Sequence, residues 1–224
     1  MLFSTLFFFI SIFAGLTANS AQLVNLGGEF DAFVAASQGK DAVGIEAEWA
    51  KFETNHQSIY DEAVYRKSDP GWEQRLRLKR DRFFVDFRTL APKMDLLFAQ
   101  APELVSRQEA HFRTVFPDLS PDIPVIFMPS LRSFNGQVRD LDEFGRPGLL
   151  LGVDFIIERG DNLDILFSHE FFHVYHEGHL KPGSTGQSMA TPLWKEGLAV
   201  YVSGVLNPGQ DDANLNGGRL RKFA

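Results

Sequence analysis

The chain has 224 residues, of which 44% are hydrophobic and 23% charged, an ordinary composition for a protein with a buried core. Its formal net charge of -7 argues against a nucleic-acid partner, because phosphate binding needs clustered positive charge. Cysteine is absent, which excludes disulfides, thiolate metal ligands and a cysteine nucleophile. Any metal must therefore be held by nitrogen and oxygen atoms, a ligand set that zinc accepts.

Residues 1–20, "MLFSTLFFFISIFAGLTANS", carry no charged side chain. An apolar run from Leu2 to Leu16 is followed by small residues that suit cleavage before Ala21, as in a secretory signal peptide. The run of about 15 residues is shorter than the roughly 20 that a membrane span needs, although a retained anchor is the competing interpretation. We expect a secreted or periplasmic protein with no stable membrane span after cleavage.

Residues 21–120 are predicted to form a helical region. Between residues 44 and 66, large apolar side chains recur at intervals of three, four and seven, which places them on one face of a helix. These residues are Ile45, Trp49, Phe52 and Ile59. Pro92 and Pro102 interrupt the later pattern, and each is expected to begin a further helix.

Residues 121–224 are predicted to form the catalytic region. Strand signals start only at "PVIFMP", residues 124–129. A loop containing Asn135-Gly136 then leads to a second expected strand, "LLLGVDFII", residues 149–157. The fold class is thus α+β, with a mainly helical N-terminal half, then a small sheet, then a pair of helices that carries the histidines.

The stretch "HEFFH" matches the zinc-peptidase pattern H-E-x-x-H. Asp161 or Asn162 can cap a helix that begins near Leu163, and on that helix His169 and His173 lie one turn apart on the same face. The surrounding residues are mostly apolar, which predicts a buried helix. Burying two imidazoles and a carboxylate costs several kcal/mol unless they are paired or bound to metal.

A third ligand is expected from "TPLWKEGLAVYVSG", which predicts a helix over residues 192–203 with Glu196 in its first turns. Gly197 suggests that another helix packs within backbone contact, as bringing Glu196 to the histidines would require. The competing ligand is His179, because His169 to His179 has the H-E-x-x-H-x-x-x-x-x-H spacing of the metzincins. Those enzymes have a glycine where this chain has His176. Glu196 is the favoured ligand.

Together, "SHEFFHVYH" and "PLWKEGLAVYVSG" resemble the gluzincin peptidases, and more closely the bacterial predicted zinc-dependent proteases whose second signature reads roughly W-x-x-E-G-L-A-x-Y. The resemblance covers residues 149–203 and implies a zincin-type helix pair. It implies that His169, His173 and Glu196 bind Zn²⁺ and that Glu170 is the catalytic general base. It also suggests that the strand at 149–157 is an edge strand that pairs with an extended substrate.

Two positions depart from the family pattern. Thermolysin has an aspartate four residues after its ligand glutamate, where this chain has Val200, so the support for a zinc histidine must come from elsewhere. Gluzincins also use a later tyrosine or histidine to stabilise the transition state. Here Tyr201 is the first candidate for that role, with Tyr175 and His176 as alternatives.

The resulting hypothesis is an exported zinc metallopeptidase that hydrolyses peptide or protein substrates. Two alternatives keep the metal: a non-catalytic zinc-binding domain that binds a partner, and a metzincin-like site that uses His179. A third alternative is a helical exported protein without metal, in which the histidines only pack.

Overall fold

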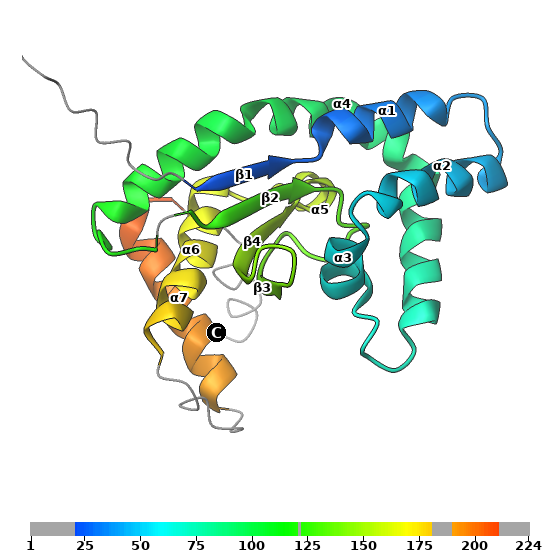
Figure 1. The fold of residues 1–224 in the computed structure, drawn as a ribbon. Helices are drawn as coiled ribbons and strands as arrows, with labels where there is room; N and C mark the ends of the chain where they lie inside the picture. The colour runs from blue at the N-terminus through cyan, green and yellow to red at the C-terminus, as the bar shows by residue number, and fades with distance from the viewer. Residues whose placement is uncertain (1–20, 121, 181–189, 211–224) are drawn as a thin grey trace, which may run out of the picture.

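The computed structural model describes residues 21–120, 122–180 and 190–210, so the predicted signal peptide lies outside the described residues (Figure 1). It confirms the α+β class. Among the described residues, no helix is long and apolar enough to cross a membrane. In chain order the elements are β1 (Gln22–Asn25), α1 (Gly27–Ala36), α2 (Ala42–Thr54), α3 (Gln57–Ile59), the π-helix η1 (Tyr60–Tyr65), α4 (Trp72–Arg113), β2 (Pro124–Met128), β3 (Gly136–Leu141), β4 (Arg146–Gly152), α5 (Val153–Arg159), α6 (Leu163–His179) and α7 (Ala190–Leu206).

The strands form one sheet in the order β1-β2-β4-β3. The first three are parallel, with Leu23 opposite Val125 and Val125 opposite Leu149, whereas β3 is antiparallel to β4 and lies at the edge. Every residue of β2 is buried, as expected for a central parallel strand covered by helices. Figure 1 shows α6 and α7 side by side, next to the end of the sheet that holds β4 and β3.

Two strand predictions were wrong. Strand signals were expected only from residue 124, yet β1 lies at Gln22–Asn25 and pairs with β2. The apolar run at 149–157 is strand only to Gly152 and then continues as α5, because a short apolar run does not distinguish a buried strand from a buried helix. β4 also lies between β2 and β3, so it is not the edge strand that the resemblance suggested.

The prediction that Pro92 and Pro102 begin new helices was also wrong, because both lie inside α4. A proline removes one backbone hydrogen bond and bends a helix, at a cost of about 3 kcal/mol. Buried residues on either side of each proline, among them Met94 and Leu104, hold the helix in the core. Figure 1 shows that α4 changes direction part-way along its length, as proline-containing helices commonly do.

The helical region is built around a cluster of aromatic rings. The four residues predicted to share one face are all buried, with Trp49 fully so. Phe33 of α1 contacts Trp49 with ring centroids 5.1 Å apart and Phe87 of α4 at 5.0 Å. One continuous core joins these rings to the sheet and α6, so the predicted helical and catalytic regions share a single core.

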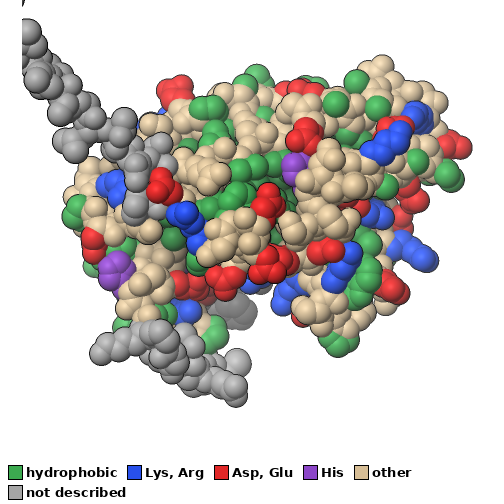
Figure 2. Space-filling view, in the orientation of Figure 1, with side chains coloured by type: hydrophobic (Ala, Val, Ile, Leu, Met, Phe, Trp, Pro, Cys, Tyr) green, Lys and Arg blue, Asp and Glu red, His purple; other side chains and the backbone are tan. Residues whose placement is uncertain are grey.

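The basic side chains between residues 75 and 88 are largely engaged with neighbouring groups. Arg80 pairs with Glu53, Arg82 with Glu158 at 2.8 Å, and Arg88 donates to the Ser37 carbonyl. On the face drawn in Figure 2, acidic and basic side chains are interspersed. Such an arrangement is typical of a solvated, salt-bridged helix surface.

A buried carboxylate organises the loop after β2. Asp154, at the start of α5, is fully buried and accepts hydrogen bonds from the Ser130 backbone N–H at 2.6 Å and the Arg132 backbone N–H at 2.7 Å. Leu131 and Arg132 both have positive φ, at 53° and 56°. Residues other than glycine rarely adopt this backbone conformation unless other contacts hold it, and the hydrogen bonds to Asp154 hold the loop here. The loop leads directly into β3.

Asp95 of α4 is expected to make stability depend on pH. Partial desolvation of its carboxyl group is the largest cause and a hydrogen bond with Asp31 of α1 the next, and together they raise the pKa of Asp95 to about 6. The folded chain therefore holds a proton that the unfolded chain releases near pH 4, so this contribution is complete below pH 4 and is lost as the pH rises through 6. Because Asp95 is exposed, we expect an effect on the order of 0.5 kcal/mol.

Thermal unfolding of the parent and of Asp95→Asn, followed from pH 4 to pH 8, measures this contribution. The parent should lose stability relative to the variant between pH 4 and pH 7. Parallel curves for the two proteins over that range would contradict the prediction.

Candidate metal centre

Helix α6 forms as its sequence predicts. Asn162 is the N-cap, and its side chain accepts hydrogen bonds from the backbone N–H groups of Asp164 at 3.0 Å and Ile165 at 3.3 Å. The helix then continues through the motif to His179. His169 and Glu170 are each only 5% exposed, so two ionisable groups of the motif lie inside the protein.

Helix α7 brings Glu196 to the histidines. Its inner face carries the small residues Ala199 and Ser203, both fully buried, so the two helix backbones can approach closely there. Just after α7, the buried side-chain amide of Asn207 donates to Ser168 Oγ at 2.9 Å and to the Asp164 carbonyl at 3.3 Å. Asn207 thus fixes the end of α7 against α6.

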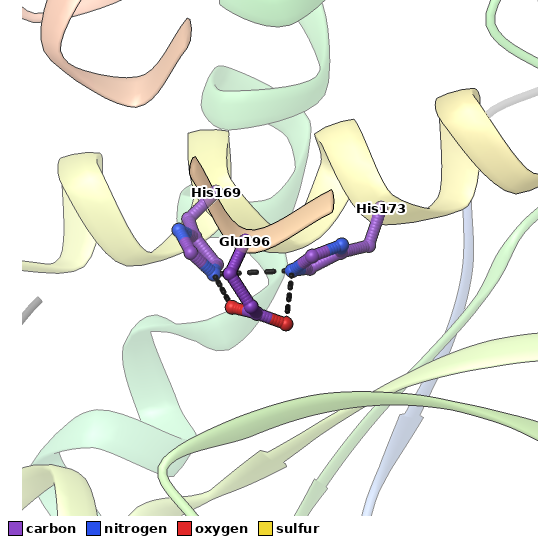
Figure 3. A group of neighbouring side chains, drawn as sticks. All are labelled: His169, His173 and Glu196. Atoms are coloured by element: carbon purple, nitrogen blue, oxygen red, sulfur yellow. Dashed lines mark hydrogen bonds and ion pairs between the residues drawn. The ribbon is translucent and has the colours of Figure 1, made fainter. Parts of the chain in front are cut away.

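His169, His173 and Glu196 form the one group of potential metal ligands found among the described residues, with a donor atom of each within 4.8 Å of the others (Figure 3). The two Nε2 atoms are 3.1 Å apart. Glu196 places one oxygen 3.4 Å from His169 Nε2 and the other 3.5 Å from His173 Nε2. Figure 3 shows that the imidazoles and the carboxylate point toward one another.

These separations fit a zinc ion. Tetrahedral zinc with bonds of about 2.0–2.2 Å keeps neighbouring ligand atoms roughly 3.3–3.5 Å apart. The nitrogen–nitrogen separation of 3.1 Å and the nitrogen–oxygen separations of 3.4 and 3.5 Å lie close to that spacing, with a different oxygen of Glu196 facing each histidine. The Glu196 side chain is 63% exposed, whereas those of the histidines are 6% and 12% exposed, so the group opens to solvent on the glutamate side.

The pKa shifts within this group favour an ionised carboxylate beside the two imidazoles. Hydrogen bonds from His169 and His173 hold the pKa of Glu196 well below its usual range. Burial lowers the pKa of His173, but the hydrogen bond to Glu196 and the charge of Glu170 outweigh it, so the net shift is upward. A carboxylate that stays ionised beside two imidazoles is a suitable ligand set for a divalent cation.

Comparison with protein families, characterised proteins and solved structures finds no match to this chain. The functional assignment therefore rests on the geometry and chemistry of the site.

Glu170 lies beside the ligands and packs against the edge strand. Burial raises the pKa of its carboxyl group, and the nearby His169 and His173 partly offset that shift. A Cβ added at Gly136 of β3 would lie 2.7 Å from both Cγ and Oε1 of Glu170. Only glycine leaves room for the carboxylate at this point, and the sequence pattern alone gave Gly136 no such role.

Replacing Gly136 by alanine is expected to destabilise the fold by about 1–3 kcal/mol, because the new methyl group must displace Glu170 in a packed interior. Gly178→Ala on α6 is the matched control, because a Cβ there meets no atom within 4 Å. Urea denaturation of both variants measures the difference. Equal stability of Gly136→Ala and the parent would show that the contact is not tight.

The structure does not bring His179 to the group. Its Nδ1 donates to the Tyr175 carbonyl at 2.8 Å, and its Nε2 lies 3.1 Å from Asp118. Tyr201 is also apart from the ligands: it is 69% exposed and lies five positions after Glu196, about 140° further round α7. The role of Tyr201 as a transition-state stabiliser stays a prediction.

The sequence predicted that support for a zinc histidine would come from a residue other than Val200. For His169 no such residue is found: its Nδ1 is buried without a hydrogen-bond partner in the part of the chain that the structure describes. The close packing predicted for Gly197 was wrong, because a Cβ there would meet no atom within 4 Å. Ala199 and Ser203 provide the close approach instead.

Proposed function

We propose that this chain is a zinc metallopeptidase of the gluzincin type, with His169, His173 and Glu196 as ligands and Glu170 as the general base. The convergence of two imidazoles and one carboxylate from two helices, with a donor atom of each within 4.8 Å of the others, carries this proposal. The buried Glu170, adjacent in sequence to the first ligand, adds the proton acceptor that peptide hydrolysis needs.

A zinc ion held by these residues would act as a Lewis acid that polarises a peptide carbonyl and makes water more acidic. Glu170 accepts a proton from the attacking water on its carboxylate. It then delivers that proton to the amide nitrogen as the C–N bond breaks, which yields a carboxylate and an amine. Its contact with Gly136 limits the space in which the carboxylate can move.

The edge strand supports an extended peptide as the substrate. β3 ends the sheet on the side of α6, and its first residue, Gly136, contacts Glu170. Edge strands bind extended peptides through backbone hydrogen bonds. A peptide paired with β3 would therefore run close to the proposed general base.

A second candidate is a zinc-binding domain without catalysis. The buried His169 Nδ1 favours it, because a catalytic zinc histidine usually donates its second N–H to a carboxylate or carbonyl, and none is present among the described residues. Measured hydrolysis distinguishes the two candidates.

Hydrolysis of an unfolded protein substrate by the zinc-loaded chain tests the proposal. The parent should cleave it, a chelator should stop cleavage, and added zinc should restore it. His173→Ala should reduce cleavage to background, whereas His179→Ala should keep it. A zinc-loaded parent that cleaves no unfolded protein or peptide library would contradict the catalytic assignment and favour the binding domain.

A further inference from the structure

The outward face of α7 is an apolar surface with no partner among the described residues. Four large side chains on it are more than half exposed, and they lie within an arc of about 120°. They are Leu193 at 72%, Trp194 at 66%, Tyr201 at 69% and Val205 at 58%. We call these four residues, with Gly197 and Gly204 between them, the outer stripe. Contiguous exposed apolar surface of this kind marks interaction sites.

The two glycines of the outer stripe need an explanation. Each costs about 1 kcal/mol relative to alanine inside a helix. A Cβ at Gly197 or at Gly204 would meet no atom within 4 Å, so the packing of the described chain does not require either. Small residues on a helix surface allow a second helix to come close. The glycines thus point to a helix that packs on α7 from outside.

The order of large and small residues along the stripe is symmetric about residue 199. Trp194 and Gly204 lie five positions to either side of it, and Tyr201 and Gly197 lie two positions to either side. If two α7 helices pack antiparallel with residue 199 at the centre, Trp194 of one copy lies opposite Gly204 of the other. Tyr201 then lies opposite Gly197, so each aromatic side chain meets a gap, and Leu193 lies opposite Val205 as an apolar pair.

We propose that the outer stripe is a self-association surface on which a second copy of this chain docks, with the two α7 helices antiparallel and centred on residue 199. Such a contact is isologous, because the same surface is used twice about a two-fold axis. The outer stripe carries no charged side chain that would be buried unpaired: Lys195 faces Glu177 at 3.4 Å, and Glu196 points toward the histidines.

The buried area sets the expected strength. Large side chains that are about two-thirds exposed contribute roughly 100–150 Å² each, so eight of them across two copies bury about 1,000 Å². That total lies at the low end of specific interfaces, which corresponds to a weak dimer. We therefore expect dissociation constants between about 1 µM and 1 mM.

Sedimentation equilibrium of the full chain across this concentration range tests the proposal without metal or substrate. The parent should dimerise. Trp194→Gly should weaken dimerisation about tenfold or more by opening a gap, and Gly204→Trp should weaken it similarly by placing two indoles opposite each other. Combining Trp194→Gly with Gly204→Trp restores one large and one small residue at each of these contacts and should recover dimerisation. Circular dichroism checks that every variant is folded.

A cysteine cross-link tests the register independently, because the chain has no cysteine of its own. The double variant Trp194→Cys with Gly204→Cys should form a disulfide-linked dimer, and neither single variant should. Within one helix these positions are about 15 Å apart, too far to bridge. A parent that is monomeric throughout, a double exchange variant that does not recover, or cross-linking by a single variant would overturn the proposal.

Discussion

Glu170→Gln is expected to remove most of the hydrolytic activity while zinc stays bound. The substitution keeps the size and shape of the side chain but removes the group that accepts a proton from water. General-base catalysis contributes about 10²–10⁴-fold, and we expect kcat/KM to fall by that factor. Glu170 is not one of the three ligands, so the zinc content should not change.

The matched control is Glu177→Gln, which removes a carboxylate from the same helix. Glu177 is exposed, lies 3.4 Å from Lys195 and is not one of the three proposed ligands. Its replacement should leave kcat/KM within a few-fold of the parent value. If Glu170→Gln retains parental kcat/KM with full zinc, Glu170 is not the general base.

Asp154→Ala is expected to have the largest effect on stability of any substitution outside the site. The carboxylate accepts the backbone N–H groups of Ser130 and Arg132 and the Ser130 hydroxyl, and it is fully buried. Its removal leaves donors without partners in the interior, at about 1–3 kcal/mol each. We expect a loss of roughly 3–5 kcal/mol, or about 10 °C in Tm for a chain of this length.

Asp140→Ala, on the exposed side of β3, provides the comparison for Asp154→Ala. It should change the free energy of unfolding by no more than about 0.5 kcal/mol, as surface substitutions commonly do. Denaturation of the two variants and the parent gives the difference directly. A loss below about 1 kcal/mol for Asp154→Ala would mean that the loop at residues 129–134 does not depend on this carboxylate.

The sequence could predict those parts of the site that depend only on residues close together in the chain. The Asn162 cap, the start at Leu163 and the one-turn spacing of His169 and His173 are set within one helix, and the structure confirms them. Glu196 was predicted as a ligand from its expected helix and from the family resemblance, but no local rule links residues 27 positions apart. The structure shows that its carboxylate lies beside both imidazoles.

The features that sequence did not reveal depend on contacts between distant segments. β1 is a strand because β2 lies beside it, about 100 residues later in the chain. Gly136 matters because Glu170 occupies the space of its missing side chain. Gly197 was explained by packing on the wrong side of α7, because one glycine does not indicate which face of a helix is covered. Such contacts are set by tertiary packing, which overrides local propensity.

The central claim is that His169, His173 and Glu196 bind zinc together. Zinc per molecule, measured by atomic emission on the purified chain after exposure to zinc and removal of excess, tests it most directly. The parent should hold one zinc, and both His173→Ala and Glu196→Gln should lose most of it, because each removes one of three ligands. A parent without zinc, or variants that retain it fully, would contradict the claim.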